Sequence, residues 1–514
     1  MSAIRRILPA RPSLEQQRKQ ARELLSGFRE GGAEAVARVR AELPDKPRIT
    51  LADTQFVLAR EYGFRSWAEL KSHIESHTAG IDPRTLFRSL VADGDAAGLR
   101  DVLRRDPAVR ALVNEPLFGF DSPALVSVAG GDDVEIVDVL LELGADPNRR
   151  SGWWAGGFHP LHSARGAVAE RLLRAGAVPD ACAAAQLDRP DLLRAMLAED
   201  PSRVHERGGD GQTPLHFARS REVADLLIDA GADLDARDVD HRSTPAEWMV
   251  ADRRELAAYL VERGATADIF LAAALGLSDR ARSLAAADPR VLDLRTSQGD
   301  YAEKAPSSYH IYQWTLGPSL TPLQVAAKLG EQATVAALLE SASPVQRLLL
   351  ACHEGRAGDA RAIVAAQPGI VERLQGADRR ALTDEAWAAN APAVVLMMEL
   401  GFDPAVPAVT GPTGGTALHC AAWEGSPECV AAILGEPRGR ALLEVQDPVY
   451  GGTPLSWCWH GSRNCGNPRA DHAGVVLLLV RAGARLRPDM LTEWDIVREL
   501  AAAGALPQAG VAQP

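Results

Sequence analysis

The stretch Thr213-Pro214-Leu215-His216-Phe217-Ala218 decides the fold, together with the apolar run Leu226 to Gly231 that follows it. Threonine here predicts a helix N-cap, because its hydroxyl can accept an unpaired backbone N–H. Proline suits the first helical position, where its missing N–H costs nothing. Leu215 predicts the buried side of a short inner helix. Gly231 predicts the left-handed residue that ends an outer helix. The stretch therefore predicts a helix-turn-helix unit.

Altered copies of this motif recur after residue 80. They are Ser122-Pro123-Ala124, His159-Pro160-Leu161-His162, Thr244-Pro245-Ala246, Thr321-Pro322-Leu323, Thr416-Ala417-Leu418-His419 and Thr453-Pro454-Leu455. The glycines expected to end the outer helices recur with a similar spacing. Gly144 and Gly176 are 32 residues apart, and Gly231 and Gly264 are 33 apart. A period near 33 with this motif resembles the ankyrin repeat. The resemblance implies an all-α ankyrin-repeat solenoid of helix-turn-helix units.

Other units lack the motif but keep a helix pair and end in an Asp-Pro or Gln-Pro turn. They run 86–113, 182–204, 269–294 and 348–374. Both kinds together predict about a dozen units over residues 85–486, with an insertion at 296–320. Residues 487–514 are expected to form a C-terminal cap and tail.

Residues 1–78 follow a different pattern and predict a small separate helical domain. Ser13-Leu14-Glu15-Gln16 is a capping box that opens a first helix. Further helices are expected at 33–43 and 51–62, and a fourth is expected to begin at Ser66. The apolar positions of these helices could bury one another without the repeats.

The chain also resembles a group of bacterial ankyrin-repeat proteins over nearly its whole length. The segments that carry this resemblance are Leu8-Pro9-Ala10-Arg11-Pro12, Leu58 to Phe64, Trp153 to Phe158 and Tyr450 to Leu455. The resemblance implies a bacterial, cytoplasmic setting and indicates no particular reaction.

The charge distribution and the cysteine content limit the classes of partner and the cell compartment that we expect for this chain. Residues 1–80 hold 14 basic and 10 acidic side chains, and the rest hold 42 and 58. Nucleic acid is therefore not expected as a partner of the acidic repeats. A helix with Arg18, Lys19 and Arg22 is the one place where it could attach. The six cysteines do not form a disulfide framework, and no apolar run is long enough to span a bilayer, so we expect a cytoplasmic chain with no membrane partner.

Eight aromatic or histidine residues depart from the repeat pattern and are the candidate binding residues. They are Trp153, Trp154, His159, Trp314, Trp423, Trp457, Trp459 and His460. The first two tryptophans are expected at a hairpin tip, where they form a recognition surface or fold beneath the tip. Trp314 lies in the insertion, which either covers a groove or patches a mismatched repeat. The late tryptophans replace small residues, so the helix stack must open there into a pocket or be filled by the rings.

One group of side chains has the chemistry of metal ligands but not a recognised spacing. His460, Cys465, Asp471 and His472 match no zinc pattern, and the residues between them are typical of an exposed loop. The sequence contains no convincing motif for phosphate binding, dinucleotide binding or nucleophilic catalysis. No metal or cofactor is therefore expected, and no catalytic residue can be assigned.

These observations predict a binding scaffold that presents a concave groove to a protein partner. The alternative is a small-molecule-binding protein or enzyme with a pocket between the aromatic-rich repeats. A closed pocket with converging His, Asp and Trp would favour this alternative, whereas an open, shallow groove favours protein binding.

Overall fold

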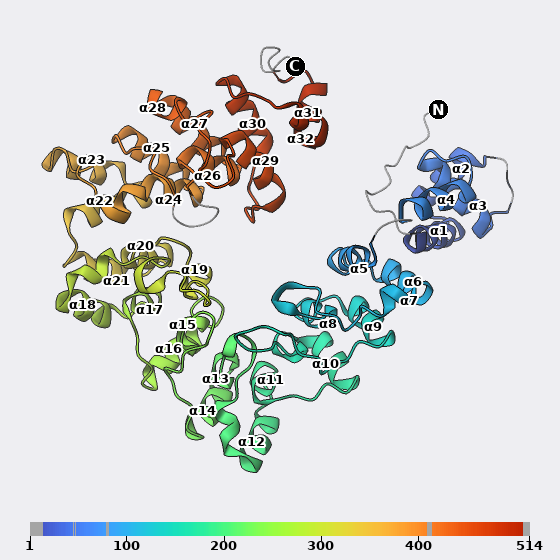
Figure 1. Cartoon of the computed structure of the whole chain (residues 1–514), viewed down its shortest axis with the longest axis horizontal. Helices are drawn as coiled ribbons and strands as arrows, with labels where there is room; N and C mark the ends of the chain where they lie inside the picture. Colours follow the sequence, from blue (N-terminus) through green and yellow to red (C-terminus); the bar gives the residue numbers. More distant parts are fainter. Residues whose placement is uncertain (1–13, 45, 47, 79–81, 409–413, 507–514) are drawn as a thin grey trace. The chain divides into compact units, whose positions relative to one another are not determined.

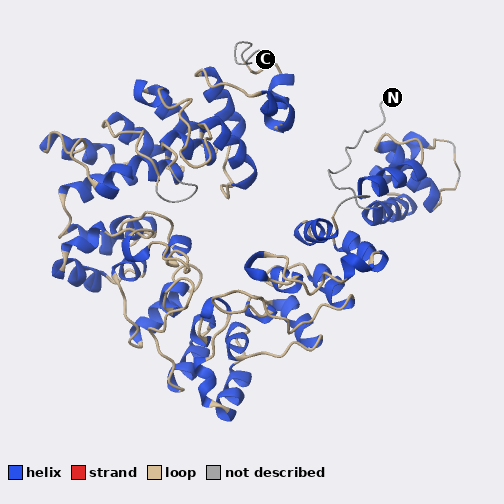
Figure 2. Cartoon of the chain, viewed as in Figure 1, coloured by secondary structure: helices blue, strands red, loops and turns tan. Residues whose placement is uncertain are grey.

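A computed structural model describes residues 14–44, 46, 48–78, 82–408 and 414–506. Helices and connecting loops account for these ranges, and no β-strand occurs within them (Figure 2). The chain divides into two compact units, residues 1–240 and 241–514, here called unit 1 and unit 2. The all-α prediction is confirmed. No helix in the described ranges is both long and apolar enough to cross a membrane.

Unit 1 begins with four helices that have small apolar cores of their own. They are α1 (Leu14–Arg29), α2 (Ala33–Glu42), α3 (Leu51–Glu61) and α4 (Trp67–Thr78). One core gathers around Leu14 and Leu70, and the other around Leu24 and Val57. Helix α1 also lies against α6 of the first repeat. Ser13 and the segment Leu8–Pro12 lie outside the described residues.

The repeats of unit 1 are short helix pairs, here called inner (first) and outer (second), with connecting turns (Figure 1). They comprise α5 (Pro83–Ala92), α6 (Ala96–Arg105), α7 (Pro107–Arg110), η1 (Gly119–Asp121), α8 (Ala124–Val128), α9 (Val134–Glu142), η2 (Pro160–His162), α10 (Gly166–Arg174), α11 (Ala181–Gln186), α12 (Pro190–Glu199), η3 (Pro201–His205), η4 (Gly209–Gly211), α13 (Pro214–Phe217) and α14 (Arg221–Asp229).

The repeats of unit 2 continue the same pattern. They comprise α15 (Pro245–Met249), α16 (Arg254–Glu262), α17 (Ile269–Ala274), α18 (Ser278–Ala287), η5 (Pro289–Asp293), η6 (Gly299–Tyr301), α19 (Tyr312–Thr315), α20 (Pro322–Lys328), α21 (Gln332–Leu339), α22 (Pro344–His353), α23 (Ala357–Ala366), η7 (Gly376–Arg380), α24 (Ala381–Trp387), α25 (Ala391–Glu399), α26 (Ala417–Trp423), α27 (Pro427–Gly435), α28 (Pro437–Arg440), α29 (Pro454–Asn464), α30 (His472–Arg481), α31 (Pro488–Glu493) and α32 (Asp495–Ala502).

The motif residues have the structural roles that their chemistry predicts. Thr213 is the N-cap of α13, and His216 completes its capping box by accepting the Thr213 N–H at Nδ1, 3.1 Å away. Leu215 is fully buried. Gly231 has a φ of 96°, so it ends α14 in the left-handed region. The repeated histidine is thus a structural residue in this unit.

Inner helices pack against inner helices and outer helices against outer helices, and this packing forms the core of each unit. In unit 1, α11 lies against α13 and α12 against α14. In unit 2, the inner helices α24, α26 and α29 contact in sequence, as do the outer helices α25, α27 and α30. Each repeat therefore buries its apolar side chains against its neighbours.

Candidate binding surfaces

Four aromatic rings at the hairpin tips of unit 1 form a partly exposed cluster, here called the fingertip patch. It consists of Phe120, Trp153, Trp154 and Phe158. Phe120 meets the Trp153 ring edge-on at 5.0 Å between centroids and the Phe158 ring at 5.4 Å, and the two tryptophans lie 5.9 Å apart. Phe120 is 54% exposed and Trp154 is 46% exposed. The patch therefore offers accessible apolar area on top of a packed aromatic base.

A hydrogen bond and close backbone contacts hold the patch in place. The Trp153 indole donates to Asp210 Oδ1 at 3.0 Å, which ties its hairpin to the tip before α13. A Cβ at Gly209 would lie 2.1 Å from Phe158 Cδ1, and one at Gly156 would lie 2.3 Å from the Gly208 carbonyl oxygen. Only glycine allows the loops to approach this closely. Trp153 is thus partly an anchor, whereas Trp154 is free to face a partner.

His159 lies beneath the tip and is buried, so its side chain serves the fold. It is the N-cap of the short turn η2, and its Nδ1 accepts the Leu161 N–H at 3.1 Å. Burial, assisted by the neighbouring His162, lowers the pKa of His159 to about 4. The imidazole is therefore neutral at pH 7 and suited to accept this bond.

A buried cluster next to it has the composition of a metal site. Single ligand atoms of His162, Asp180 and Cys182 all lie within 4.8 Å of one another. His162 Nε2 lies 3.0 Å from Asp180 Oδ2, and the Arg150 guanidinium forms an ion pair with the same carboxylate. The Ala183 N–H also donates to Asp180, at 2.7 Å.

Protein groups already satisfy the members of this cluster. Burial alone would raise the pKa of Asp180, but the bonds from His162, Ala183 and Arg150 lower it below its usual range. Burial raises the pKa of the Cys182 thiol well above its ordinary value. A metal ion would have to displace the arginine and deprotonate the thiol, so the arrangement favours a hydrogen-bonded joint between repeats.

The insertion at 296–320 is fastened to unit 2 by tyrosines. Tyr301 and Tyr312 donate their hydroxyls to the two oxygens of Asp268, at 2.8 and 3.0 Å. Burial, reinforced by the charge of Glu247, raises the pKa of Asp268. The ring of His310 packs against these tyrosines, and its centroid lies 4.5 Å from that of the Tyr312 ring. Trp314 is 65% exposed and lies outside this buried polar core.

Three tryptophans of unit 2 meet on consecutive inner helices and form what is here called the tryptophan cluster. Trp387 ends α24 and Trp423 ends α26, and their rings are nearly parallel, at 12° with centroids 6.3 Å apart. Trp457 of α29 meets them at 84° and 74°, at 6.2 and 6.0 Å. Trp387 and Trp423 are half-buried, whereas Trp457 is buried and donates its indole N–H to Asp447 at 3.0 Å.

Trp459 and His460 lie at the following positions of α29 but outside this cluster. Trp459 stacks on Trp494, which lies between α31 and α32, with centroids 5.9 Å apart, and Arg463 and Arg487 lie over its ring. Its role is thus to pack α29 against the segment that joins α31 and α32. His460 is exposed.

The structure brings together only part of the ligand-type group near His460. Cys465 Sγ lies 3.8 Å from His472 Nε2, and that same nitrogen lies 3.0 Å from the Trp423 carbonyl oxygen. Asp471 caps α30 by accepting the Gly474 N–H. His472 and Asp471 thus hold backbone groups in place.

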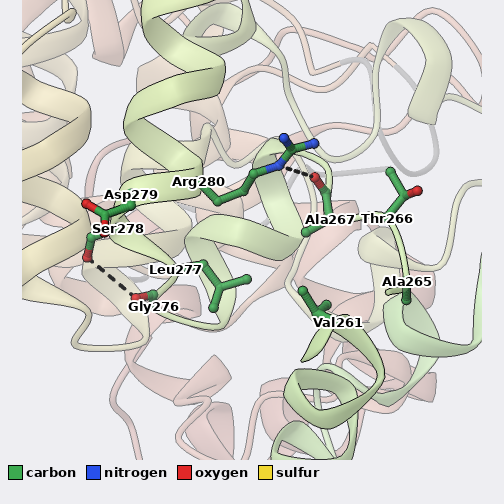
Figure 3. A pocket seen from close by; sticks show the side chains of 9 residues that line it. All are labelled: Val261, Ala265, Thr266, Ala267, Gly276, Leu277, Ser278, Asp279 and Arg280. Atoms are coloured by element: carbon green, nitrogen blue, oxygen red, sulfur yellow. Dashed lines mark hydrogen bonds between the residues drawn. The ribbon is translucent and has the colours of Figure 1, made fainter. Parts of the chain in front are cut away.

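A cavity of about 640 Å³ lies elsewhere in unit 2 and opens widely to solvent (Figure 3). The ends of α16 and α18 and the turns beside them line it: Val261, Ala265, Thr266, Ala267, Gly276, Leu277, Ser278, Asp279 and Arg280. Arg280 donates to the Ala267 carbonyl at 3.2 Å, and Asp279 is paired with Arg282. Neither histidine nor tryptophan is among the lining residues, so the cavity does not have the convergent chemistry expected of the enzyme alternative.

Sequence reasoning missed Phe120, Phe158 and Trp387. Trp387 could have been found, because it stands at the end of its inner helix just as Trp423 does. Phe120 gave no such signal. Its position depends on a φ of 61°, which follows from the packing of the tip.

Comparisons with known proteins agree with this architecture. The ankyrin-repeat family model matches residues 210–239 and 413–447. The ANK repeat-containing protein nipk-1 of Caenorhabditis elegans is 32% identical over a region that covers 23% of this chain and 18% of that protein. The similarity therefore spans less than a fifth of the relative's length.

Helix pairs with capped inner helices, glycine-ended outer helices and like-on-like stacking define a helical repeat solenoid. Together with the family match, they show that the fold is an all-α ankyrin-repeat solenoid.

Proposed function

We propose that this chain is a binding scaffold for a protein partner, and that the fingertip patch of unit 1 is one surface that the partner covers. The observation that carries this proposal is the exposure of Phe120 and Trp154 above a packed aromatic base. Large rigid aromatics give much contact area at small entropic cost, and they dominate the binding energy of many interfaces.

The backbone beneath Phe120 supports the same proposal. Phe120 and Asp121 have φ values of 61° and 50°, which residues other than glycine rarely adopt. The cost is about 1–3 kcal/mol per residue, and it is tolerated where surrounding structure enforces it. Here the Gly152 N–H donates to the Asp121 carbonyl at 2.9 Å. The strain keeps a phenylalanine at the surface, which is explained if a partner uses it.

The double change Phe120→Ser/Trp154→Ser tests the proposal. Proteins captured from the native organism's extract by the unaltered chain should be lost with this variant, while its melting temperature stays within about 2 °C. Val178→Ser is the matched control, because Val178 is also apolar and exposed in unit 1, at 69%. Equal capture by all three chains would contradict the proposal.

The other exposed candidates remain proposed contacts of a partner. Trp314 and His460 lie at the surface of unit 2, and Trp423 is half-buried there. His159 and Trp457 are buried and Trp459 stacks on Trp494, so any contribution of these three to binding is indirect. The cavity residues do not favour the small-molecule or enzyme alternative.

We also propose a bacterial, cytoplasmic setting. The six cysteines are all free, and five of them are buried. Buried thiols without disulfides are typical of a reducing compartment. Cell fractionation with an antibody against the chain would check this, and recovery in a secreted fraction would contradict it.

A further inference from the structure

Three hairpin tips of unit 1 are joined at Asp210. The Trp153 indole donates to its carboxylate at 3.0 Å, and the N–H groups of Val239 and Asp240 donate to its main-chain oxygen at 2.8 and 3.2 Å. Asp210 itself is buried and has a φ of 56°. The tips that carry Trp153 and Val239 are therefore both fixed to the tip that lies between them in the chain.

Val239 extends the exposed apolar area of the fingertip patch. Its side chain is 42% exposed. A Cβ at Gly211 would lie 2.3 Å from Val239 Cγ2. Gly209, two residues earlier, is covered in the same way by Phe158. Because both side chains pack on the same tip, the apolar surface continues from the fingertip patch to Val239.

An exposed arginine supplies positive charge at this tip. Arg207 Nη1 donates to the main-chain oxygens of Gly211 and Arg237, at 2.6 and 2.8 Å. Within the described ranges no carboxylate pairs with the Arg207 side chain, although the chain after residue 80 holds 42 basic and 58 acidic residues. The edge of this guanidinium formed by Nε and Nη2 is therefore available to a carboxylate of another molecule.

We propose that the fingertip patch, extended to Val239, binds an acidic segment of the partner protein. Apolar side chains of the segment cover Phe120, Trp154 and Val239, and one of its carboxylates pairs with Arg207. The planar edge of a guanidinium matches a carboxylate with two parallel hydrogen bonds, which adds direction as well as strength. This inference rests on the proposed function and adds the charge of the partner to it.

The probe is a peptide selected from a random library displayed on phage, with the full chain as target and its Phe120→Ser/Trp154→Ser variant as counter-selection. The selected peptides should be acidic and should carry aromatic or aliphatic residues. One of them, synthesised with a fluorescent label, gives the Kd by fluorescence anisotropy. Arg207→Gln should raise this Kd roughly ten-fold, since a charge-assisted pair is lost. Val239→Ser should raise it about three-fold, since less apolar area is buried.

Two further variants separate the charge of Arg207 from its bonds to the tip. Arg207→Lys keeps the charge and should raise the Kd less than Arg207→Gln does. Arg165→Gln removes the same charge from an exposed position before α10 and should leave the Kd unchanged. Equal effects of the two Arg207 variants would overturn the proposal, as would selected peptides that are neutral or basic. In those cases the fingertip patch stands, whereas a selection that yields no peptide dependent on Phe120 and Trp154 would count against the patch itself.

Discussion

His159 stands where the other motif copies have a threonine or serine, and this exchange makes a helix cap sensitive to acid. A threonine hydroxyl accepts a backbone N–H at any ordinary pH. The imidazole Nδ1 accepts the Leu161 N–H only while it is neutral. The fold holds the pKa of His159 at about 4, against 6.5 for a free histidine.

The first prediction concerns this cap. Because the folded-state pKa is depressed, the stabilisation is present above pH 6.5 and is lost as the pH falls through 4. The loss should be ~3 kcal/mol at most. His159→Asn keeps an acceptor and removes the titration, so this variant should lose less stability between pH 7 and pH 4.5 in urea unfolding of the full chain. Equal losses in both proteins would contradict the prediction.

Asp384 gives a prediction of opposite sign. Its pKa is raised to about 7 in the fold, so its stabilising contribution is complete below about 3.8 and declines as the pH rises to 7. Asp384→Asn removes the cost of a buried charge and should stabilise unit 2 by up to ~4 kcal/mol at pH 8.5, but by less than half of that at pH 5. Calorimetric melts at the two pH values would check this. A variant less stable at pH 8.5 would show that Arg295 and Arg380, whose charges oppose the rise of this pKa, need the carboxylate.

At the scale of one helix, Leu215 tests the repeat register. It is fully buried in α13, the four-residue inner helix that α11 contacts. Leu215→Ala should destabilise the chain by about 2–5 kcal/mol, the usual cost of truncating a buried leucine. Denaturant unfolding measures the change. An unchanged midpoint would mean that this short helix contributes little to the core.

The sequence predicted the helices well, but it did not predict the contacts between loops that are far apart in the sequence. Thr213, Gly231 and their copies act through neighbours within a few residues, so the motif suffices to place the helix ends. Phe120 is displayed by backbone strain, and Trp153 is held by Asp210, 57 residues away. Such bonds depend on the register between stacked repeats, which no local pattern records. The candidate site was therefore located at Trp153 and Trp154 without the residues that complete it.

At the scale of the whole chain, the N-terminal helices are predicted to be dispensable for folding of the repeats. Their two small cores are separate from the repeat core that begins at Phe87. Removal of residues 1–78 should leave a cooperative melt, lowered only by the lost contact of α1 with α6. Aggregation of the truncated chain would show instead that α1 is the required cover of the first repeat.

The close packing of two glycines around Trp457 limits the substitutions that this chain can accept during evolution. Gly415 and Gly452 flank the indole, and a Cβ at Gly415 would lie 2.6 Å from its Cη2. A Cβ at Gly452 would lie 2.9 Å from the Asp447 oxygen that binds the indole N–H. Neither glycine can be replaced while the indole stays, and the indole cannot arise before both glycines are present. The residues at these three positions should therefore vary together among related sequences. Where the tryptophan is replaced, other residues should be tolerated in place of both glycines.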